Sequence, residues 1–229
     1  MAPIPEVSIL REVPLFSELK EDDLEVIMQM TVRRAYNKST LIVLEEASAD
    51  TLYIIETGSV KITRLNEEGR EVILALLGSA EFFGEMALLD GQGRSANVMA
   101  LEDTILYTLN RRDFLDVLHR FPSISIQLLR EMTLRLRKSD QQIKSLSLSD
   151  AEHRIGITLN RIAEDMGIFK MGKVVISKLP YQQDIANMAG TSRETVSRML
   201  KNLEAKGLVQ REGHRLTIND YSAFTRIFG

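Results

Sequence analysis

The chain contains no cysteine and no tryptophan. The lack of cysteine excludes disulfide bonds, thiol redox sensing and iron–sulfur clusters held by thiolates. The three histidines, His119, His153 and His214, lie far apart without the spacing of metal ligands, so neither a zinc nor a haem site is expected. No nucleophile-and-base arrangement and no phosphate-binding P-loop is present either, and we therefore do not expect an enzyme.

Long apolar runs are also missing. No stretch approaches the roughly 18 to 20 uninterrupted apolar residues that a membrane span needs. The first residues, M-A-P-I-P-E-V, lack the charged start and the apolar core of a signal peptide. We therefore expect a cytoplasmic protein without a membrane partner, and the length of 229 residues suits one large or two modest domains.

The net charge of −3 conceals an uneven distribution. Residues 151–229 carry 12 Lys+Arg against 8 Asp+Glu, a net charge of +4, whereas residues 1–150 carry 17 against 24, a net charge of −7. A basic segment attracts the phosphates of nucleic acid, so the C-terminal part is the candidate for binding it.

Residues 190–207 have the pattern of a short helix with one buried face. Val196, Met199, Leu200 and Leu203 recur at spacings of three and four. Thr191 followed by Glu194 predicts a capping box at the start, and Gly207 predicts a left-handed residue at the end. The preceding run Y-Q-Q-D-I-A-N-M-A-G predicts another short helix that ends at Gly190. Two such helices form a helix-turn-helix whose second helix enters the major groove of double-stranded DNA.

The polar face of this second helix suits base recognition. Arginine donates to O6 and N7 of guanine, and glutamate accepts from N4 of cytosine. The alternative is that Glu194 only caps the helix or pairs with Arg198 four residues on. Residues 207–218 alternate like a hairpin with its turn at Glu212-Gly213, which adds a wing. The predicted DNA contacts are Arg193, Glu194, Arg198, Thr191, Ser192, Thr195, Ser197, Lys201, Gln182 and His214.

The N-terminal part has the pattern of many short strands. Residues 52–78 contain two β-rich runs on either side of Asn66 to Gly69, a hairpin signature. Similar runs at 39–44 and 94–109 predict a small jelly-roll barrel, which a helix within 19–30 precedes.

Two motifs resemble one known family. The pattern S-R-E-T-V-S-R-x-L-x-x-L-x-x-x-G at 192–207 closely resembles the recognition helix of the cyclic-AMP receptor protein / fumarate-nitrate reductase regulator (CRP/FNR) superfamily of bacterial transcription regulators. F-F-G-E-M-A-L-L-D-G-Q-G-R-S-A at 82–96 is similar to the phosphate-binding cassette of its cyclic-nucleotide branch. The resemblance implies an α+β fold: a cyclic-nucleotide-binding double-stranded β-roll at 1–121, a coiled-coil dimerisation helix at 122–148 and a winged helix-turn-helix at 149–229. At three turns where the family usually has glycine, this chain has Ser39, Ala47 and Ala80.

The cassette has the chemistry that a cyclic nucleotide needs. The guanidinium of Arg94 suits the phosphate oxygens, and Ser95 adds a hydroxyl and a backbone N–H. Gly84 lets the backbone approach closely, and Glu85 can accept from the ribose 2′-hydroxyl. The resemblance assigns these four residues the same roles, and Met86 and Ala87 complete the predicted ligand contacts of the cassette.

Residues 122–148 predict a long helix with a dimer seam. An a/d stripe runs through Leu129, Met132, Leu136, Ser139, Ile143 and Leu146, while Arg130, Arg135, Arg137 and Lys138 face outward. Such a stripe indicates a parallel homodimer. Ser149 with Glu152 then predicts a capping box that opens a further helix ending at Gly167.

The polar position of the stripe bears on the ligand. By resemblance, Ser139 offers its hydroxyl to the adenine of cyclic AMP, and Asp140 stands where the partner subunit reaches the same base. A carboxylate there accepts from the adenine 6-amino group or selects a different base. The alternative for Ser139 is that it only fixes the register of the coiled coil.

The sequence as a whole predicts a homodimeric regulator controlled allosterically by cyclic AMP. By resemblance it binds a TGTGA-like palindrome and acts on RNA polymerase. Three alternatives stay open: the same fold binds DNA without any ligand, it responds to cyclic di-GMP or another effector, or the chain is an enzyme with an incidental helix-turn-helix.

Overall fold

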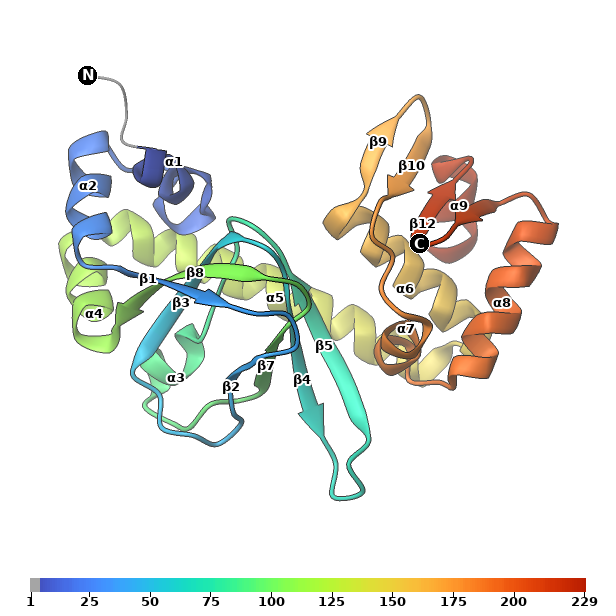
Figure 1. The fold of residues 1–229 in the computed structure, drawn as a ribbon, viewed down its shortest axis with the longest axis horizontal. Coiled ribbons are helices and arrows are strands. Elements are labelled where there is room, and N and C mark those ends of the chain that lie inside the picture. Colours follow the sequence, from blue (N-terminus) through green and yellow to red (C-terminus); the bar gives the residue numbers. More distant parts are fainter. Residues whose placement is uncertain (1–4) are drawn as a thin grey trace. The chain divides into compact units, whose positions relative to one another are not determined.

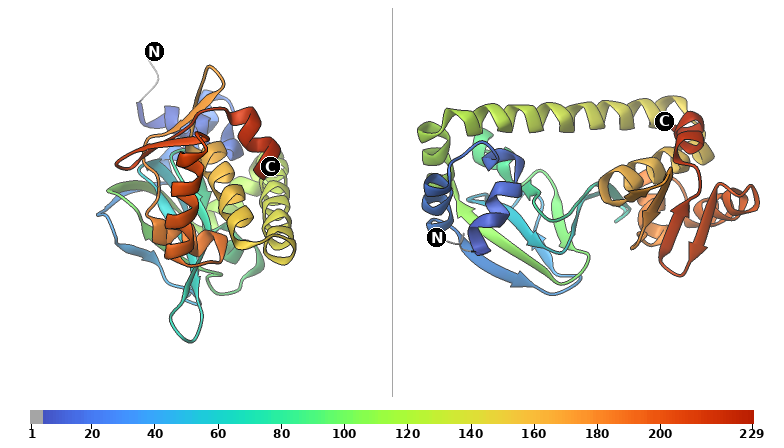
Figure 2. Two further views of the ribbon diagram at one scale, coloured as in Figure 1. Left: turned by 90° about the vertical axis from the view of Figure 1, so that its right-hand side faces the viewer. Right: turned by 90° about the horizontal axis from the view of Figure 1, so that it is seen from above.

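The computed structural model describes residues 5–229, which form two compact units. The first unit extends to residue 70 and includes 74–137, and the second comprises 71–73 and 138–229. The border falls within α5 (Pro122–Leu148), a single continuous helix that covers the predicted range (Figure 2). Within residues 5–229, no helix is both long enough and apolar enough to cross a membrane.

The first unit is built on two four-stranded sheets (Figure 1). One has the order β1 (Val32–Tyr36), β8 (Thr104–Asn110), β3 (Thr51–Thr57) and β6 (Phe82–Phe83), with antiparallel pairing throughout. The other has the order β2 (Leu41–Val43), β7 (Asn97–Ala100), β4 (Val60–Leu65) and β5 (Glu71–Leu77). The predicted hairpin joins β4 to β5, and the side chain of Asn66 accepts from the backbone N–H groups of Glu68 and Arg70 to hold its turn.

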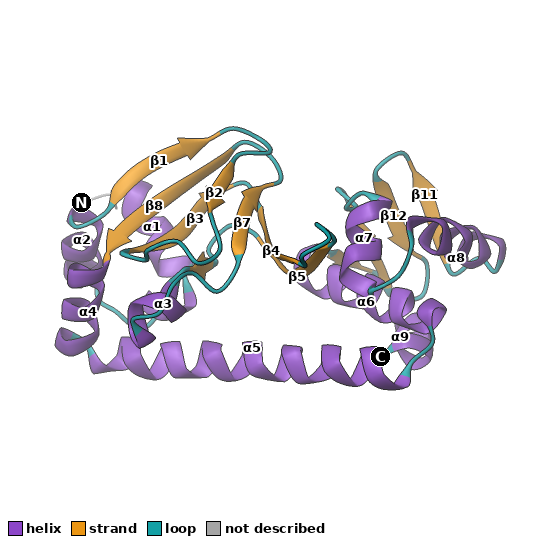
Figure 3. Ribbon diagram, turned by 90° about the horizontal axis from the view of Figure 1, so that it is seen from below, coloured by secondary structure: helices purple, strands orange, loops and turns teal. Residues whose placement is uncertain are grey.

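Two apolar clusters hold this unit together. Ile55, Phe83 and Leu106 belong to one of them, which is made of strand residues. The other cluster joins β3 and β8 to the short helix at Pro14–Phe16, to α1 (Pro5–Glu12), α2 (Glu21–Gln29), α4 (Arg111–Arg120) and to the start of α5. Phe114 and Phe16 are fully buried in it, and each such side chain contributes roughly 1.5–3 kcal/mol. α1, α4 and the short α3 (Glu85–Asp90; Figure 3) have no counterpart among the predicted elements.

Turns without glycine keep a left-handed backbone. Ser39 and Ala80, two of the three positions where the family usually has glycine, have φ angles of 66° and 65°, and Glu46 beside Ala47 has 65°. An L-residue in this conformation costs roughly 1–2 kcal/mol. Ser39 and Ala80 therefore take the left-handed conformation at an energetic cost, whereas Ala47 has no positive φ.

The second unit combines helices with a four-stranded sheet. After α6 (Ala151–Met166) come β9 (Ile168–Lys170), β10 (Lys173–Ile176), α7 (Gln182–Ala189), α8 (Arg193–Ala205), β11 (Val209–Glu212), β12 (Arg215–Ile218) and α9 (Tyr221–Phe228). The predicted hairpin is β11–β12, with Gly213 at φ 60° in its turn. It extends further than expected, because β12 also pairs with β10 and β10 with β9.

The start of α6 differs from the prediction by one residue. Asp150, and not Ser149, is the N-cap: its Oδ1 accepts from the backbone N–H of His153 at 2.8 Å. Aspartate and serine are both good N-caps, so the sequence pattern alone does not separate adjacent candidates. The helix ends at Met166, directly before Gly167, as predicted.

Candidate functional site

Arg94 lies inside the β-roll, with 6% of its surface exposed. Its Nη1 donates to the carbonyl of Gly84 at 3.0 Å, and its Nη2 donates to the carbonyl of Thr51 at 2.7 Å. The guanidinium also lies 5.6 Å from the ring centre of Tyr53, which stacks on Phe83. The backbone thus fixes the guanidinium in place, and these two bonds use only two of its five N–H groups.

Only glycine fits at position 84. Gly84 has φ 89°, and a Cβ there would lie 2.6 Å from Nη1 of Arg94 and 2.9 Å from the carbonyl oxygen of Thr51. Gly84 is also the residue before α3, so its left-handed conformation directs the chain into that helix. In the free protein, the group that the backbone of Gly84 approaches closely is the guanidinium of Arg94.

Glu85 is buried with one oxygen bonded and one unbonded. Its Oε1 accepts from Nη1 of Arg135 at 3.1 Å, and 3% of the residue is exposed. Arg135 also donates to the carbonyl of Phe82 at 2.7 Å and lies over the ring of Phe82 at 4.6 Å. Oε2 of Glu85 has no hydrogen-bond partner within the described residues. A buried acceptor in this state is costly, so it is suited to accept a hydrogen bond from a ligand hydroxyl.

Arg135 departs from its predicted orientation. It was expected to face outward from the coiled coil, and it instead forms an ion pair with Glu85 inside the first unit. Removing one partner of such a pair leaves a buried charge and costs roughly 3–5 kcal/mol. The a/d pattern could not reveal this contact because it carries no information about which face of the helix meets the roll.

Two of the remaining cassette residues lie at the surface, and one is buried. Ser95 is exposed, its Oγ lies 3.8 Å from Sδ of Met86, and Met86 is half exposed, whereas Ala87 is buried. Gly84 directly precedes α3 and Glu85 is its first residue, while Arg94 reaches the carbonyl of Gly84 and Ser95 lies beside Met86 of the same helix. Ser139 and Asp140 are exposed on the part of α5 that belongs to the second unit.

Three exposed apolar residues of α5 follow a heptad. Leu129, Leu136 and Ile143 are 67%, 62% and 62% exposed. Residues seven apart lie within about 20° of each other around a helix, so these three share one face. Two other stripe residues have contacts within their own units: Met132 packs against the apolar core of the roll, and Leu146 lies beside Gly190.

The helix-turn-helix has the predicted faces. Val196, Met199, Leu200 and Leu203 are buried in α8, and Gly190 ends α7 with φ 60° and ψ 47°. The exposed residues of α8 include Arg193, Glu194, Arg198 and Lys201, with Ser197 and Thr195 partly exposed. Gly207 has φ 69° after the end of α8, as the sequence predicted.

The start of α8 again differs by one residue. Ser192, and not Thr191, is the N-cap, because its Oγ accepts from the backbone N–H of Thr195 at 3.2 Å. Hydrogen bonds from its own backbone N–H and from Ser192 lower the pKa of the Glu194 carboxyl, and nearby Arg193 adds to the effect. These bonds favour the capping alternative for Glu194 in the free protein.

Arg198 is paired loosely with a residue of α6. Its Nε lies 3.9 Å from Oε1 of Glu152, and both side chains are largely exposed. An exposed pair of this kind contributes at most about 1 kcal/mol. Arg198 therefore remains available to bind DNA.

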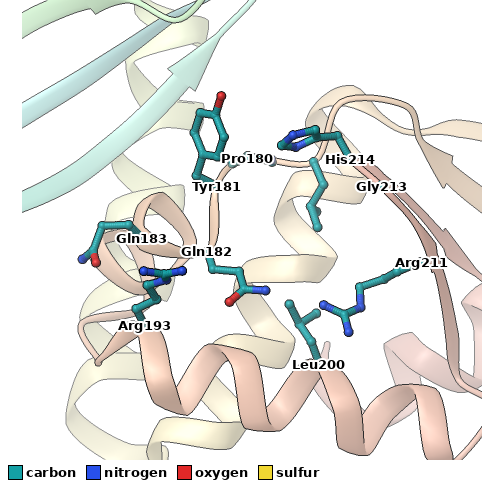
Figure 4. Close-up of a pocket in the computed structure, with 10 residues that line it drawn as sticks. Pro180, Tyr181, Gln182, Gln183, Arg193, Leu200, Arg211, Gly213 and His214 are labelled. Atoms are coloured by element: carbon teal, nitrogen blue, oxygen red, sulfur yellow. The ribbon is translucent and has the colours of Figure 1, made fainter.

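A cavity of about 560 Å³ lies beside α8 in the second unit (Figure 4). Three predicted DNA contacts from three segments line it: Gln182 from α7, Arg193 from α8 and His214 from the β11–β12 turn. Arg211 also lines the cavity, forms an ion pair with Glu204, and has a buried Nε without a partner among the described residues. Arg211 is not among the predicted DNA contacts, because its place in a strand gives no signal of its position beside α8.

Each half of the chain matches a known family of domains. Residues 33–121 match a family model described as a cyclic nucleotide-binding domain, and residues 153–227 match one described as a Crp-like helix-turn-helix domain. The cyclic AMP receptor protein of Thermus thermophilus is 34% identical over 197 residues, which cover 86% of this chain and 88% of the relative.

Solved structures have the same fold. FixK2 of Bradyrhizobium japonicum has a TM-score of 0.77 at 22% identity, covering 87% of this chain and 98% of that one. The c-di-GMP responsive global regulator CLP of Xanthomonas campestris has a TM-score of 0.72 at 25% identity, covering 87% of this chain and 99% of that one. The predicted α+β architecture is thereby confirmed.

Proposed function

Because the chain belongs to the CRP/FNR superfamily of transcription regulators, we propose that it is a homodimeric DNA-binding regulator controlled by cyclic AMP. The ligand binds in the β-roll, and α8 of each protomer binds one half of a palindromic site in double-stranded DNA. The protein acts in the cytoplasm by binding, without catalysis, and its DNA complex recruits or blocks RNA polymerase.

The observation that carries the ligand proposal is the pair Arg94 and Glu85. A cyclic nucleotide has an anionic phosphate and a ribose 2′-hydroxyl within one rigid ring system. The unused N–H groups of Arg94, with Ser95, suit the phosphate oxygens, and charge-assisted bonds of this type are the strong ones. The unpaired Oε2 of Glu85 suits the 2′-hydroxyl, because that hydroxyl is a hydrogen-bond donor.

The choice of base depends on α5. In our proposal, Ser139 offers its hydroxyl to adenine and Asp140 of the partner subunit accepts from the adenine 6-amino group. The alternative effector is cyclic di-GMP, and two observations support it. Asp140 replaces the serine that is more common in the family, and one structural relative is described as responsive to c-di-GMP.

Calorimetry of the full chain with cyclic AMP and with cyclic di-GMP tests the ligand. We expect heat and a higher melting temperature with cyclic AMP, since a ligand that binds only the folded state stabilises it. Arg94→Leu should weaken binding at least about tenfold, because charge-assisted hydrogen bonds contribute roughly 1.5–3 kcal/mol each. The matched control is Arg64→Leu, which removes an exposed arginine of the roll paired with Glu45 and should leave the affinity unchanged.

Three results would redirect the proposal. A response to cyclic di-GMP alone would identify the other effector. A rise in cyclic AMP affinity in Asp140→Ser would mean that this carboxylate selects against adenine. No heat and no shift with either nucleotide would mean that the protein binds DNA without nucleotide control.

A further inference from the structure

Arg154, in the first turn of α6, donates to three backbone carbonyls. Its Nε bonds the oxygen of Ala189 at 2.8 Å, its Nη2 that of Gly190 at 3.0 Å, and its Nη1 that of Ser149 at 2.9 Å. All of these residues lie in the second unit. The guanidinium therefore joins the segment before α6 to the end of α7, about 35 residues further along the chain.

The three carbonyls lie where helices end. Ala189 is the last residue of α7, Gly190 is its left-handed cap, and Ser149 follows the last residue of α5. The final carbonyls of a helix have no partner within that helix, and a cation near them interacts favourably with the helix dipole. Arg154 thus satisfies the orphaned carbonyls of the α7–α8 turn and ties this turn to the end of α5.

A second contact supports the same junction. A Cβ on Gly190 would lie 2.9 Å from Cδ2 of Leu146, so the side chain of Leu146 on α5 lies directly against the turn. Gly190 also needs its positive φ of 60°. α8 begins only three residues later, at Arg193, so the position of the turn determines where α8 starts.

We infer that Arg154 is a positioning residue that holds the α7–α8 turn against the end of α5 and so sets the direction in which α8 meets DNA. The inference rests on the proposed DNA-binding role of α8. Hydrogen bonds to base edges weaken steeply with small displacements, whereas attraction to phosphates is long-ranged and independent of sequence. Loss of positioning therefore lowers specific binding and spares nonspecific binding.

The test compares Arg154→Lys with the unmodified chain on DNA. First, selection from random DNA with the unmodified chain supplies a consensus duplex and a scrambled control duplex. Lysine keeps the charge and lacks the planar fork that reaches three carbonyls. We expect Arg154→Lys to bind the consensus at least about tenfold more weakly, with unchanged affinity for scrambled DNA and an unchanged salt slope. Arg226→Lys, an equivalent change at an exposed position on α9, should leave both affinities unchanged.

A loss of stability is distinguished from a loss of positioning by titrating the protein with consensus DNA at a concentration far above the dissociation constant. This titration gives the fraction of molecules that can bind DNA. If Arg154 only stabilises the unit, Arg154→Lys lowers the melting temperature and the active fraction, and the active molecules bind with unchanged affinity, which overturns the inference. The inference is also overturned if Arg154→Lys keeps the full affinity for the consensus. In that case only the positive charge of residue 154 would matter, as it would for a contact with a DNA phosphate. If the unmodified chain selects no consensus at all, the failure lies with the proposed function of α8.

Discussion

At the residue scale, the two buried charges of the cassette are balanced unequally. Arg94 donates to two backbone carbonyls. In Glu85, only Oε1 accepts a hydrogen bond, from Nη1 of Arg135. Burying an ionised group is costly unless it is paired and hydrogen-bonded, so the free oxygen of Glu85 is a local deficit. A ligand hydroxyl that removes this deficit binds more favourably than the same hydroxyl would at a solvated carboxylate.

Ser39 offers a test of backbone strain. It is exposed and has φ 66°, so Ser39→Gly removes a strain of roughly 1–2 kcal/mol while adding roughly 0.5–1 kcal/mol of chain entropy to the unfolded state. We expect a net gain of about 0.5–1 kcal/mol, seen as a melting temperature about 2 °C higher. Ser39→Ala is the control, since alanine keeps the strain. If Ser39→Gly melts no higher than Ser39→Ala, the left-handed backbone at this position is not strained.

Glu194 should make the stability of the second unit depend on pH. Its own backbone N–H, Ser192 and Arg193 lower the pKa of its carboxyl below 4.5, so the ionised form is favoured in the folded state. Its contribution is therefore present above pH 4.5 and is lost as the pH falls through the folded-state pKa. We expect Glu194→Gln to melt below the unmodified chain at neutral pH and to converge with it in acid. A difference that stays constant from pH 7 to pH 3 would exclude this account.

Sequence patterns predicted the buried faces of helices better than the contacts between distant residues. The apolar period placed Val196 and Leu203 in the buried face of α8 correctly. The caps were wrong by one residue because T-S-R-E and S-R-E-T both contain a capping side chain, and the backbone angles decide between Thr191 and Ser192. The ion pair of Arg135 with Glu85 joins residues 50 positions apart, which no local pattern encodes.

At the element scale, α5 has contacts on more than one face. Leu128 is buried in the core of the first unit, and Lys138 pairs with Asp165 of α6 in the second. Leu129, Leu136 and Ile143 remain exposed at heptad spacing. The length of α5 was predictable from its long apolar period. The ten-residue α4 was not predicted, because a short segment does not let the spacing of Phe114, Val117 and Leu118 separate a helix from a strand.

A charge in the seam should separate the protomers. Leu136→Glu places a carboxylate where the paired helices would bury it, at a cost of several kcal/mol. We expect sedimentation to show monomers at micromolar concentration. Leu134→Glu is the matched control, because Leu134 is also exposed (53%) and lies about 160° around the helix from Leu136. If Leu136→Glu remains a dimer, or if both variants dissociate equally, the dimer contact lies elsewhere.

At the scale of the whole molecule, a two-fold dimer requires a two-fold DNA site. Selection from random DNA should return a palindrome whose half-sites, similar to TGTGA, lie about 34 Å apart. Arg193→Ala or Arg198→Ala should each cost about 1–3 kcal/mol and relax one base position. Lys201→Ala should weaken binding to all sequences alike and flatten the salt slope by about one unit. A non-palindromic consensus, or one unchanged by Arg198→Ala, would show that another face of α8 contacts the bases.

The continuity of α5 across both units limits how the gene can change in length. A single codon inserted between Arg137 and Lys138 would rotate the rest of the helix by about 100°, carrying Ile143 away from the face of Leu129 and Leu136. Seven inserted codons would restore the phase within about 20° and lengthen the helix by roughly 10 Å. Insertions and deletions in this helix are therefore expected to survive selection only in multiples near seven.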